Sequence, residues 1–225
     1  MHTNVIKHFL ATNLDLILKK SLINCHVVGV DSVLFDDTPR SRIRLFVANE
    51  NHELWKNYFP PTEELSVAFH SHHCDLVLSP VIGEFINIVI EQTKPNKSPK
   101  ARWLTGYKHQ SKINTGECKF VCGGYDRFFK LKNIEQSYAY DGDDIVNVDV
   151  TLAANELHTI YVSKGQFAAW FVFEEAEDPD YDSTCYSNVD LTKFDDSQLY
   201  KHMNESYLRK LIERVFGIDK NLKIG

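Results

Sequence analysis

Residues 25–174 form a succession of short apolar or alternating segments, separated by Gly, Pro, Asn and Asp. In SRIRLFVAN, the side chains of Ile43, Leu45 and Val47 alternate with other side chains, which is typical of a strand with one buried face. About ten such segments follow one another at close spacing, which indicates a sheet that closes on itself or folds into two layers. We therefore predict a mainly β fold, either a jelly roll or a barrel.

Helical patterns flank this β region on both sides. Residues 3–22 carry an apolar stripe at helical spacing. From about residue 196, one helical face collects larger side chains, namely Leu199, Met203, Tyr207, Leu211 and Val215. Gly217 follows where a helix commonly ends. We predict a helix in residues 1–24 that packs on the barrel, a β-barrel in residues 25–175, and an acidic loop with a C-terminal helix in residues 176–225.

Composition excludes several functions. A chain of 225 residues can bury a sizeable core without a disulfide or a metal ion. Its net charge of -6 disfavours nucleic acid as a partner, because phosphate binding requires a basic face. No segment resembles a signal peptide or a membrane span. Five scattered cysteines are expected to be reduced thiols, which predicts a cytoplasmic protein.

Residues 67–75, VAFHSHHCD, concentrate side chains that can bind metals. If this segment continues a strand, His70 and His72 share one face and Phe69 takes the other. Two imidazoles so placed can bind one ion through bonds of about 2.0–2.2 Å. His-x-His pairs also occur by chance on surface strands, so a structural β domain with incidental histidines stays open at this point.

These residues resemble the two motifs of the cupin superfamily, which consists largely of metal-dependent jelly-roll proteins. His70 and His72 match the His-x-His pair of the first motif, and Gly83 matches its closing glycine. The segment AANELHTIYV resembles the second motif, with His158 where the third histidine ligand stands. The resemblance covers roughly residues 40–174. It implies a cupin-like double-stranded β-helix, a divalent metal ion and, as is frequent among cupins, a homodimer.

The sequence departs from the cupin pattern at the position of a further ligand. The glutamate of the first motif would fall on Leu76 or Val77, which are both apolar. Asp75 is the nearest acid and a candidate ligand if the turn is tighter than usual, with His73 as another substitute. The resemblance therefore implies a site made of three histidines, His70, His72 and His158, to which Asp75 can be added.

Three neutral imidazoles leave open coordination positions and can bind Fe(II), Mn(II), Ni(II), Cu(II) or Zn(II). Among cupins, three-histidine iron sites are similar to those of thiol and diketone dioxygenases, whereas zinc or manganese suits isomerases and lyases. We predict a metal-dependent enzyme that acts on a small polar molecule, with a dioxygenase ahead of an isomerase or lyase. A cupin that binds a small ligand without turnover is the alternative.

Substrate-binding residues are harder to predict from the sequence. Arg102, with Trp103 and Tyr107 nearby, could bind a carboxylate at the mouth of the barrel. No phosphate-binding, zinc-protease or serine-hydrolase motif is present in the sequence.

Overall fold

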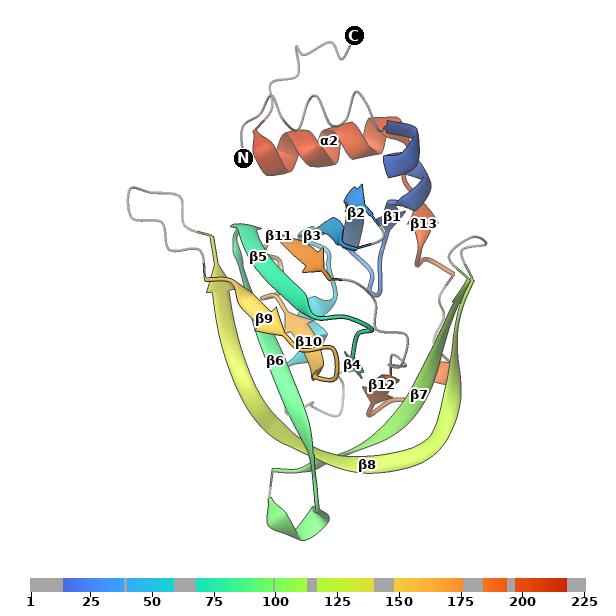
Figure 1. The fold of residues 1–225 in the computed structure, drawn as a ribbon, viewed down its shortest axis with the longest axis vertical. Helices are drawn as coiled ribbons and strands as arrows, with labels where there is room; N and C mark the ends of the chain where they lie inside the picture. Colours follow the sequence, from blue (N-terminus) through green and yellow to red (C-terminus); the bar gives the residue numbers. More distant parts are fainter. Residues whose placement is uncertain are drawn as a thin grey trace.

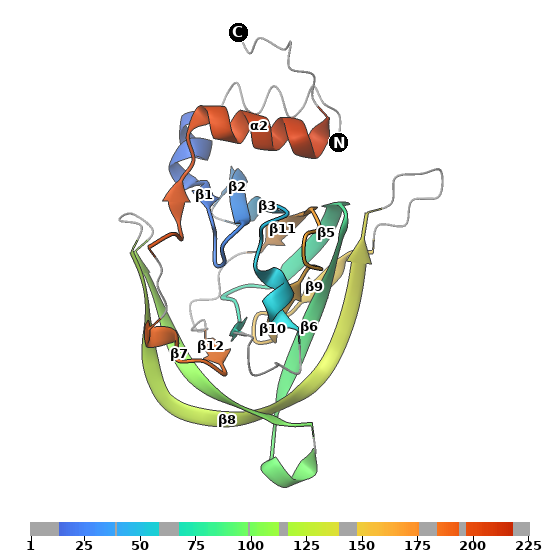
Figure 2. The ribbon, with the colours of Figure 1, turned by 180° about the vertical axis from the view of Figure 1, so that it is seen from behind.

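The computed structural model describes residues 14–38, 40–58, 68–98, 100–112, 117–139, 148–175, 184–193 and 197–217. Within these ranges the protein is mainly β, with two layers of antiparallel strands and a helix lying across the top in Figure 1. Figure 2 shows the same arrangement from behind.

The first layer is a seven-stranded sheet, here called sheet A. Its strands lie in the order β13 (Lys201–His202), β1 (Leu22–Ile23), β2 (Val30–Asp37), β3 (Arg42–Ala48), β11 (Ala168–Glu174), β5 (Leu76–Ile82) and β9 (Val150–Leu152). Neighbours pair antiparallel throughout. Because β3 pairs with β11, segments far apart in the sequence lie side by side at its centre.

The second layer is a closed barrel of six strands, here called barrel B. Its strands lie in the order β10 (Leu157–Tyr161), β4 (Ala68–His70), β12 (Thr184–Ser187), β7 (Arg102–Lys112), β8 (Glu117–Tyr138) and β6 (Glu84–Thr93). Short 3-10 helices occur in the connections: η1 (Leu54–Asn57), η2 (Pro95–Lys97) and η3 (Leu191–Lys193). The strand β8 curves under the molecule beside β6 and β7 (Figure 1).

The strand β8 differs from the sequence expectation. It is one continuous strand of 22 residues, where the sequence indicated only short segments separated by residues such as glycine. A Cβ atom on Gly123 would lie 2.9 Å from the ring of Tyr125, and one on Gly106 of β7 would lie 2.5 Å from the same ring. Glycine at both positions therefore makes room for an aromatic side chain where the pairing of β7 and β8 shifts register.

Sheet A is apolar on both faces. One face carries Val33 and Leu45, which pack with Leu208 and Ile212 of helix α2 (Glu205–Phe216) in a cluster here called the helix layer. The other face packs against barrel B and includes Trp170. A third cluster, around Phe69, Ile88 and Phe129, comes entirely from barrel strands. Within each strand, successive side chains point to opposite faces, and this alternation determines which cluster a strand residue joins.

Helix α2 begins later than predicted. The side chain of Asn204 accepts a hydrogen bond from the backbone N–H of Tyr207 at 2.9 Å and so caps the first turn. Leu199 and Met203 are buried but precede the helix. Gly217, with a φ of 63°, ends it as expected.

The segments on either side of the predicted β region are described only in part. Residues 14–20 are helical, and Ile17 belongs to the helix layer, whereas residues 3–13 of the predicted helix lie outside the described residues. Most of the predicted acidic loop, residues 176–183, also lies outside them. The strands β12 and β13 follow residue 175, so the sheets take up more of the chain than the predicted range 25–175.

No described helix combines the length and apolar character that a membrane crossing requires.

The strand order and the flanking helices confirm the predicted mainly β class, with a closed barrel packed against a second antiparallel sheet. In this arrangement β10 lies between β4 and β6, so that the two histidine motifs occupy neighbouring strands.

Candidate metal centre

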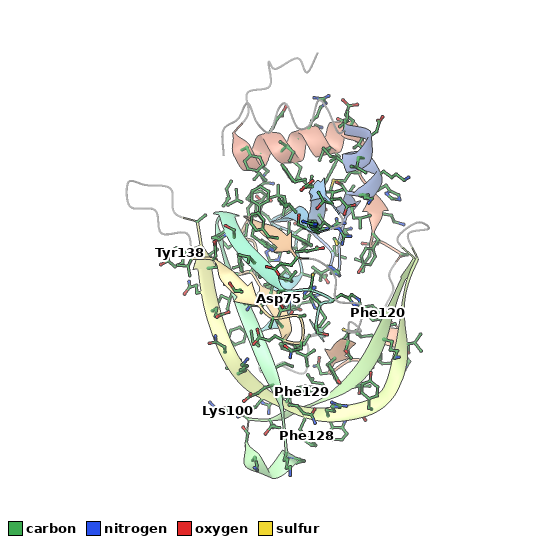
Figure 3. All side chains as sticks on the ribbon, viewed as in Figure 1. Asp75, Lys100, Phe120, Phe128, Phe129 and Tyr138 are labelled. Atoms are coloured by element: carbon green, nitrogen blue, oxygen red, sulfur yellow. The ribbon has the colours of Figure 1, made fainter. Side chains whose placement is uncertain are left out.

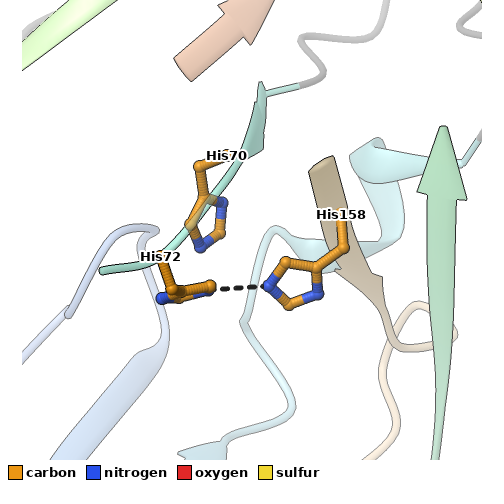
Figure 4. Close-up of side chains that lie close together, drawn as sticks. All are labelled: His70, His72 and His158. Carbon is orange, nitrogen blue, oxygen red and sulfur yellow. Dashed lines mark hydrogen bonds between the residues drawn. The ribbon is translucent and has the colours of Figure 1, made fainter. Parts of the chain in front are cut away.

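Three histidines predicted from the sequence converge on one point (Figure 4). The ligand-capable ring atoms of His70, His72 and His158 all lie within 4.8 Å of one another. The Nε2 atoms of His72 and His158 are 2.9 Å apart. The ring of His70 lies 4.7 Å from that of His72 and 4.9 Å from that of His158, centroid to centroid. We call this group the histidine triad.

Strand pairing brings two of these residues together. His158 on β10 lies directly opposite His70 on β4, and paired residues of neighbouring strands project to the same face. On the other side of β10, His158 lies opposite Val89, which packs in the cluster between barrel B and sheet A. The triad therefore belongs to the face of the barrel that is directed toward sheet A.

His72 reaches the triad by a different route from the one predicted. The strand β4 ends at His70, so His72 lies beyond it rather than two positions along it. Its backbone N–H donates to the carbonyl oxygen of Ala154 at 3.0 Å, which ties the segment after β4 to the turn before β10. The loop thus places the second histidine beside the third.

Asp75 helps to hold this turn. One of its carboxylate oxygens accepts a hydrogen bond from the backbone N–H of Ala154 at 2.8 Å. Asp75 is exposed, and its place near the centre of the molecule is labelled in Figure 3. Among the described residues, the group of side chains that could hold an ion consists of the three histidines without Asp75 or His73.

Burial favours the uncharged form of two triad residues, His158 and His72. His158 is 3% exposed, and burial is the main reason why its pKa lies well below the ordinary 6.5, followed by the charge that His70 would carry. Burial likewise lowers the pKa of His72 well below that value, with His158 as the next cause. Imidazoles that are neutral at pH 7 offer the lone pairs that a divalent ion requires.

Asn87 on β6 orients the ring of His158. The amide Oδ1 of Asn87 lies 2.8 Å from Nδ1 of His158, while its Nδ2 donates to a carboxylate oxygen of Glu135 at 3.1 Å. Because the NH2 group faces the carboxylate, Oδ1 must face the ring and accept from Nδ1–H. The lone pair of His158 is then on Nε2, directed at the centre of the triad. Such a partner is usual for a histidine that binds a metal ion.

The donor set fits a divalent ion. Bonds of about 2.1 Å at tetrahedral angles would separate ligand nitrogens by roughly 3.4 Å. The 2.9 Å between the Nε2 atoms of His72 and His158 differs from this by a few tenths of an ångström, which small ring rotations can supply. Three imidazoles leave at least one coordination position open.

Two features of this centre were not predicted. Asn87 is fully buried and interrupts an apolar strand, and that lone amide in GEFINIVIE is the signal that could have revealed it. His26 lies in the loop between β1 and β2, and its ring stacks on that of His70 with centroids 5.7 Å apart and planes 28° apart. No periodic pattern in the sequence indicates the position of His26.

The residues predicted to bind a carboxylate lie on β7. Tyr107 lies opposite Cys185 of β12, which lies opposite His70, so Tyr107 is two strands or roughly 10 Å from the triad. Tyr107 is buried, and its hydroxyl donates to the carbonyl oxygen of Val189 at 3.1 Å. Its hydroxyl is thus already engaged within the fold.

The other two residues of this set also have local partners. Trp103 is half exposed and packs edge-on against Phe128, which Figure 3 places at the lower bend of β8. Arg102 donates to the carbonyl oxygen of Ala101 at 3.4 Å. A role of Arg102, Trp103 and Tyr107 in substrate binding stays a prediction.

Comparisons with known proteins assign no family to this chain. No protein-family model matches the sequence, and no curated protein matches it. Among solved structures, the polyketide cyclase RemF from Streptomyces resistomycificus is similar over 77% of this chain and 82% of its own, with 13% identity and a TM-score of 0.35. Procruciferin, an 11S globulin from Brassica napus, is similar over 88% of this chain and 45% of its own, with 8% identity and a TM-score of 0.32. The fold is therefore assigned from the strand order and register of the protein itself.

Proposed function

We propose that the protein binds one divalent metal ion through His70, His72 and His158 and acts on a small polar molecule at that ion. The observation that carries this proposal is the convergence of three ring nitrogens within 4.8 Å of one another on the face of barrel B that is directed toward sheet A. A bound ion would supply a Lewis acid or a redox centre. The leading assignment is an oxidoreductase of the dioxygenase type, with an isomerase or lyase as the alternative.

The residues of this chain have distinct roles in the proposal. His70, His72 and His158 would hold the ion, and Asn87 would keep the lone pair of His158 directed at it. Asp75 would act indirectly, by holding the turn on which Ala154 meets the backbone of His72. The surrounding apolar cluster of sheet A and barrel B would limit access of water to the buried side of the ion.

The metal content of the purified protein tests the proposal. We expect about one equivalent of a divalent metal in the wild type and less than a tenth of that in His158→Ala and His70→Ala. His202→Ala, which removes an exposed histidine outside the triad, is the matched control and should keep its metal. Each sample should be measured by elemental analysis as purified and again after incubation with Fe(II), Mn(II) and Zn(II) separately.

The identity of the retained metal separates the two enzymatic assignments. Iron in the purified protein would support the oxidoreductase, and zinc or manganese would support an isomerase or lyase. A wild-type protein that binds none of the three ions, in spite of a folded circular dichroism spectrum, would rule out the metal centre and the function built on it.

A further inference from the structure

We propose that His26 donates a hydrogen bond to the molecule that occupies the open position of the metal centre, and that Tyr200 and Asn24 hold His26 in place for this contact. The inference rests on the proposed metal-binding function. It identifies the ligand class as one that presents a negatively charged or electron-rich atom beside the ion, such as a carboxylate or an enolate oxygen.

His26 stands beside the triad without belonging to it. Its ring stacks on that of His70, yet it is not part of the group whose ligand atoms lie within 4.8 Å of one another. It is also close enough to contribute to the lowered pKa of both His72 and His158. His158 is buried and the other two triad residues are half-buried, whereas His26 is exposed. His26 thus stands beside the triad with part of its side chain open to solvent.

The two ring nitrogens of His26 have different surroundings. Nδ1 lies 3.1 Å from the hydroxyl of Tyr200, and the rings of the two residues meet edge to face. With the hydroxyl as the donor, Nδ1 accepts and the ring proton resides on Nε2, which is the tautomer that the proposal requires. Nε2 has no hydrogen-bond partner among the described residues, so its proton is available to a ligand.

Unusual backbone conformations bring this pair into position. Asn24, His26 and Tyr200 are the non-glycine residues with positive φ among the described residues, with values of 55°, 68° and 54°. Such conformations are uncommon for residues with a side chain, and they cluster at functional sites where surrounding contacts hold them. Here all three occur together, next to a candidate metal centre.

Asn24 supplies the surrounding contacts. Its carbonyl oxygen accepts from the backbone N–H of Tyr200 at 3.2 Å, and its side-chain Oδ1 accepts from the backbone N–H of Gly29 at 2.8 Å. Its side-chain amide donates to the carbonyl oxygen of Gln198 at 3.0 Å. Its backbone N–H donates to the buried carboxylate of Asp31 at 3.1 Å. Asn24 thus joins the loop that carries His26 to the segment that carries Tyr200.

Azide binding to the cobalt-loaded protein tests the inference, because azide is a small anion that binds an open metal position and changes the visible spectrum. We expect His26→Gly to retain its Co(II) and to bind azide about tenfold more weakly than the wild type. Glycine is chosen because it tolerates the positive φ and removes only the ring. His26→Gln, which restores an N–H donor, should recover part of the affinity.

Two further variants complete the design. Tyr200→Phe keeps the ring and removes the hydroxyl, so azide affinity should fall by about threefold while the Co(II) content stays unchanged. His202→Ala deletes an exposed imidazole two residues from Tyr200 and should behave like the wild type.

The outcomes separate this inference from the proposed function. Unchanged azide affinity in metal-loaded His26→Gly would overturn the role of His26 and leave the metal centre intact. Loss of Co(II) from the same variant would show that His26 is a ligand, which also contradicts the inference. A wild type without Co(II) would remove the metal centre, and the inference with it.

Discussion

The helix layer and the histidine triad each contain a fully buried side chain, but these side chains differ in chemistry. Leu208 in the helix layer is 0% exposed, and His158 in the triad is 3% exposed. Burial of the first removes apolar surface from water and stabilises the fold. Burial of the second lowers the pKa of an imidazole and is favourable only because Asn87 accepts its hydrogen bond. The comparison teaches that the helix layer stabilises the fold by apolar burial. The histidine triad instead carries polar groups whose burial must be offset by hydrogen bonds or by a bound ligand.

The largest effect should come from the helix layer. Leu208→Ala should lower the free energy of unfolding by about 2–5 kcal/mol, because the removed side chain leaves a cavity in a layer without polar alternatives. Urea unfolding checks the stability, and elemental analysis checks the metal content, which should not change. A variant that loses its metal while it remains folded would show that the two regions are not independent.

A smaller effect, confined to the triad, is expected from Asn87→Ala. Loss of the acceptor for Nδ1 of His158 should weaken metal binding by about 10–100-fold, as measured by competition with a chromophoric chelator. Ser137→Ala is the matched control, since it removes the hydrogen bond of another fully buried polar side chain of barrel B, to the carbonyl oxygen of Val148. Equal losses of affinity in the two variants would reduce Asn87 to a structural role.

Acid should affect the triad before it affects the helix layer. In the metal-free protein the pKa values of His72 and His158 are lowered on folding, so the unfolded state takes up protons first as the pH falls below about 6.5. The stability is therefore fully present above pH 6.5 and is lost at lower pH, with a slope of up to about 1.4 kcal/mol per pH unit for each histidine.

Urea unfolding at pH 7.5, 6.5 and 5.5 in the presence of a chelator measures this slope. His158→Gln should flatten it, whereas Leu208→Ala should shift the whole curve downward without changing its shape. A wild-type curve that stays level between pH 6.5 and 5.5 would contradict the lowered pKa values.

The smallest effect is expected at the surface near the triad. Lys132 forms an ion pair with Glu156, whose carboxylate also accepts from the backbone N–H of Ala153 in the turn before β10. Lys132→Ala should change the unfolding free energy by no more than about 0.5 kcal/mol and leave metal binding as it is, because exposed ion pairs contribute little. A larger effect on the metal than on stability would mean that this turn controls the position of His72.

The sequence predicts the two regions unequally well. The apolar face of α2 follows from local helical spacing. Its first residue, Glu205, is set by the cap that Asn204 provides, and the spacing alone also allowed an earlier start. The triad follows from the His-x-His pair and the resemblance around His158. Asn87 and His26 were missed because each matters only through a partner that is remote in the chain.

The length of β8 was missed for a related reason. Short apolar runs separated by glycines predict turns, whereas the space for the ring of Tyr125 depends on Gly106 of a neighbouring strand as well as on Gly123. Contacts between strands are not contained in the local pattern, so the overall class was predictable and the course of this strand was not.

The ligands of the triad come from two parts of the chain, since His72 and His158 are 86 positions apart. An ion held between them would act as a non-covalent crosslink that closes a long loop, and such links restrict the unfolded chain most when the loop is long. Only a chain with β10 already docked beside β4 could offer all three nitrogens at once. Binding of the ion during folding would then indicate that the barrel has assembled, and the rate of ion release would limit the rate of unfolding.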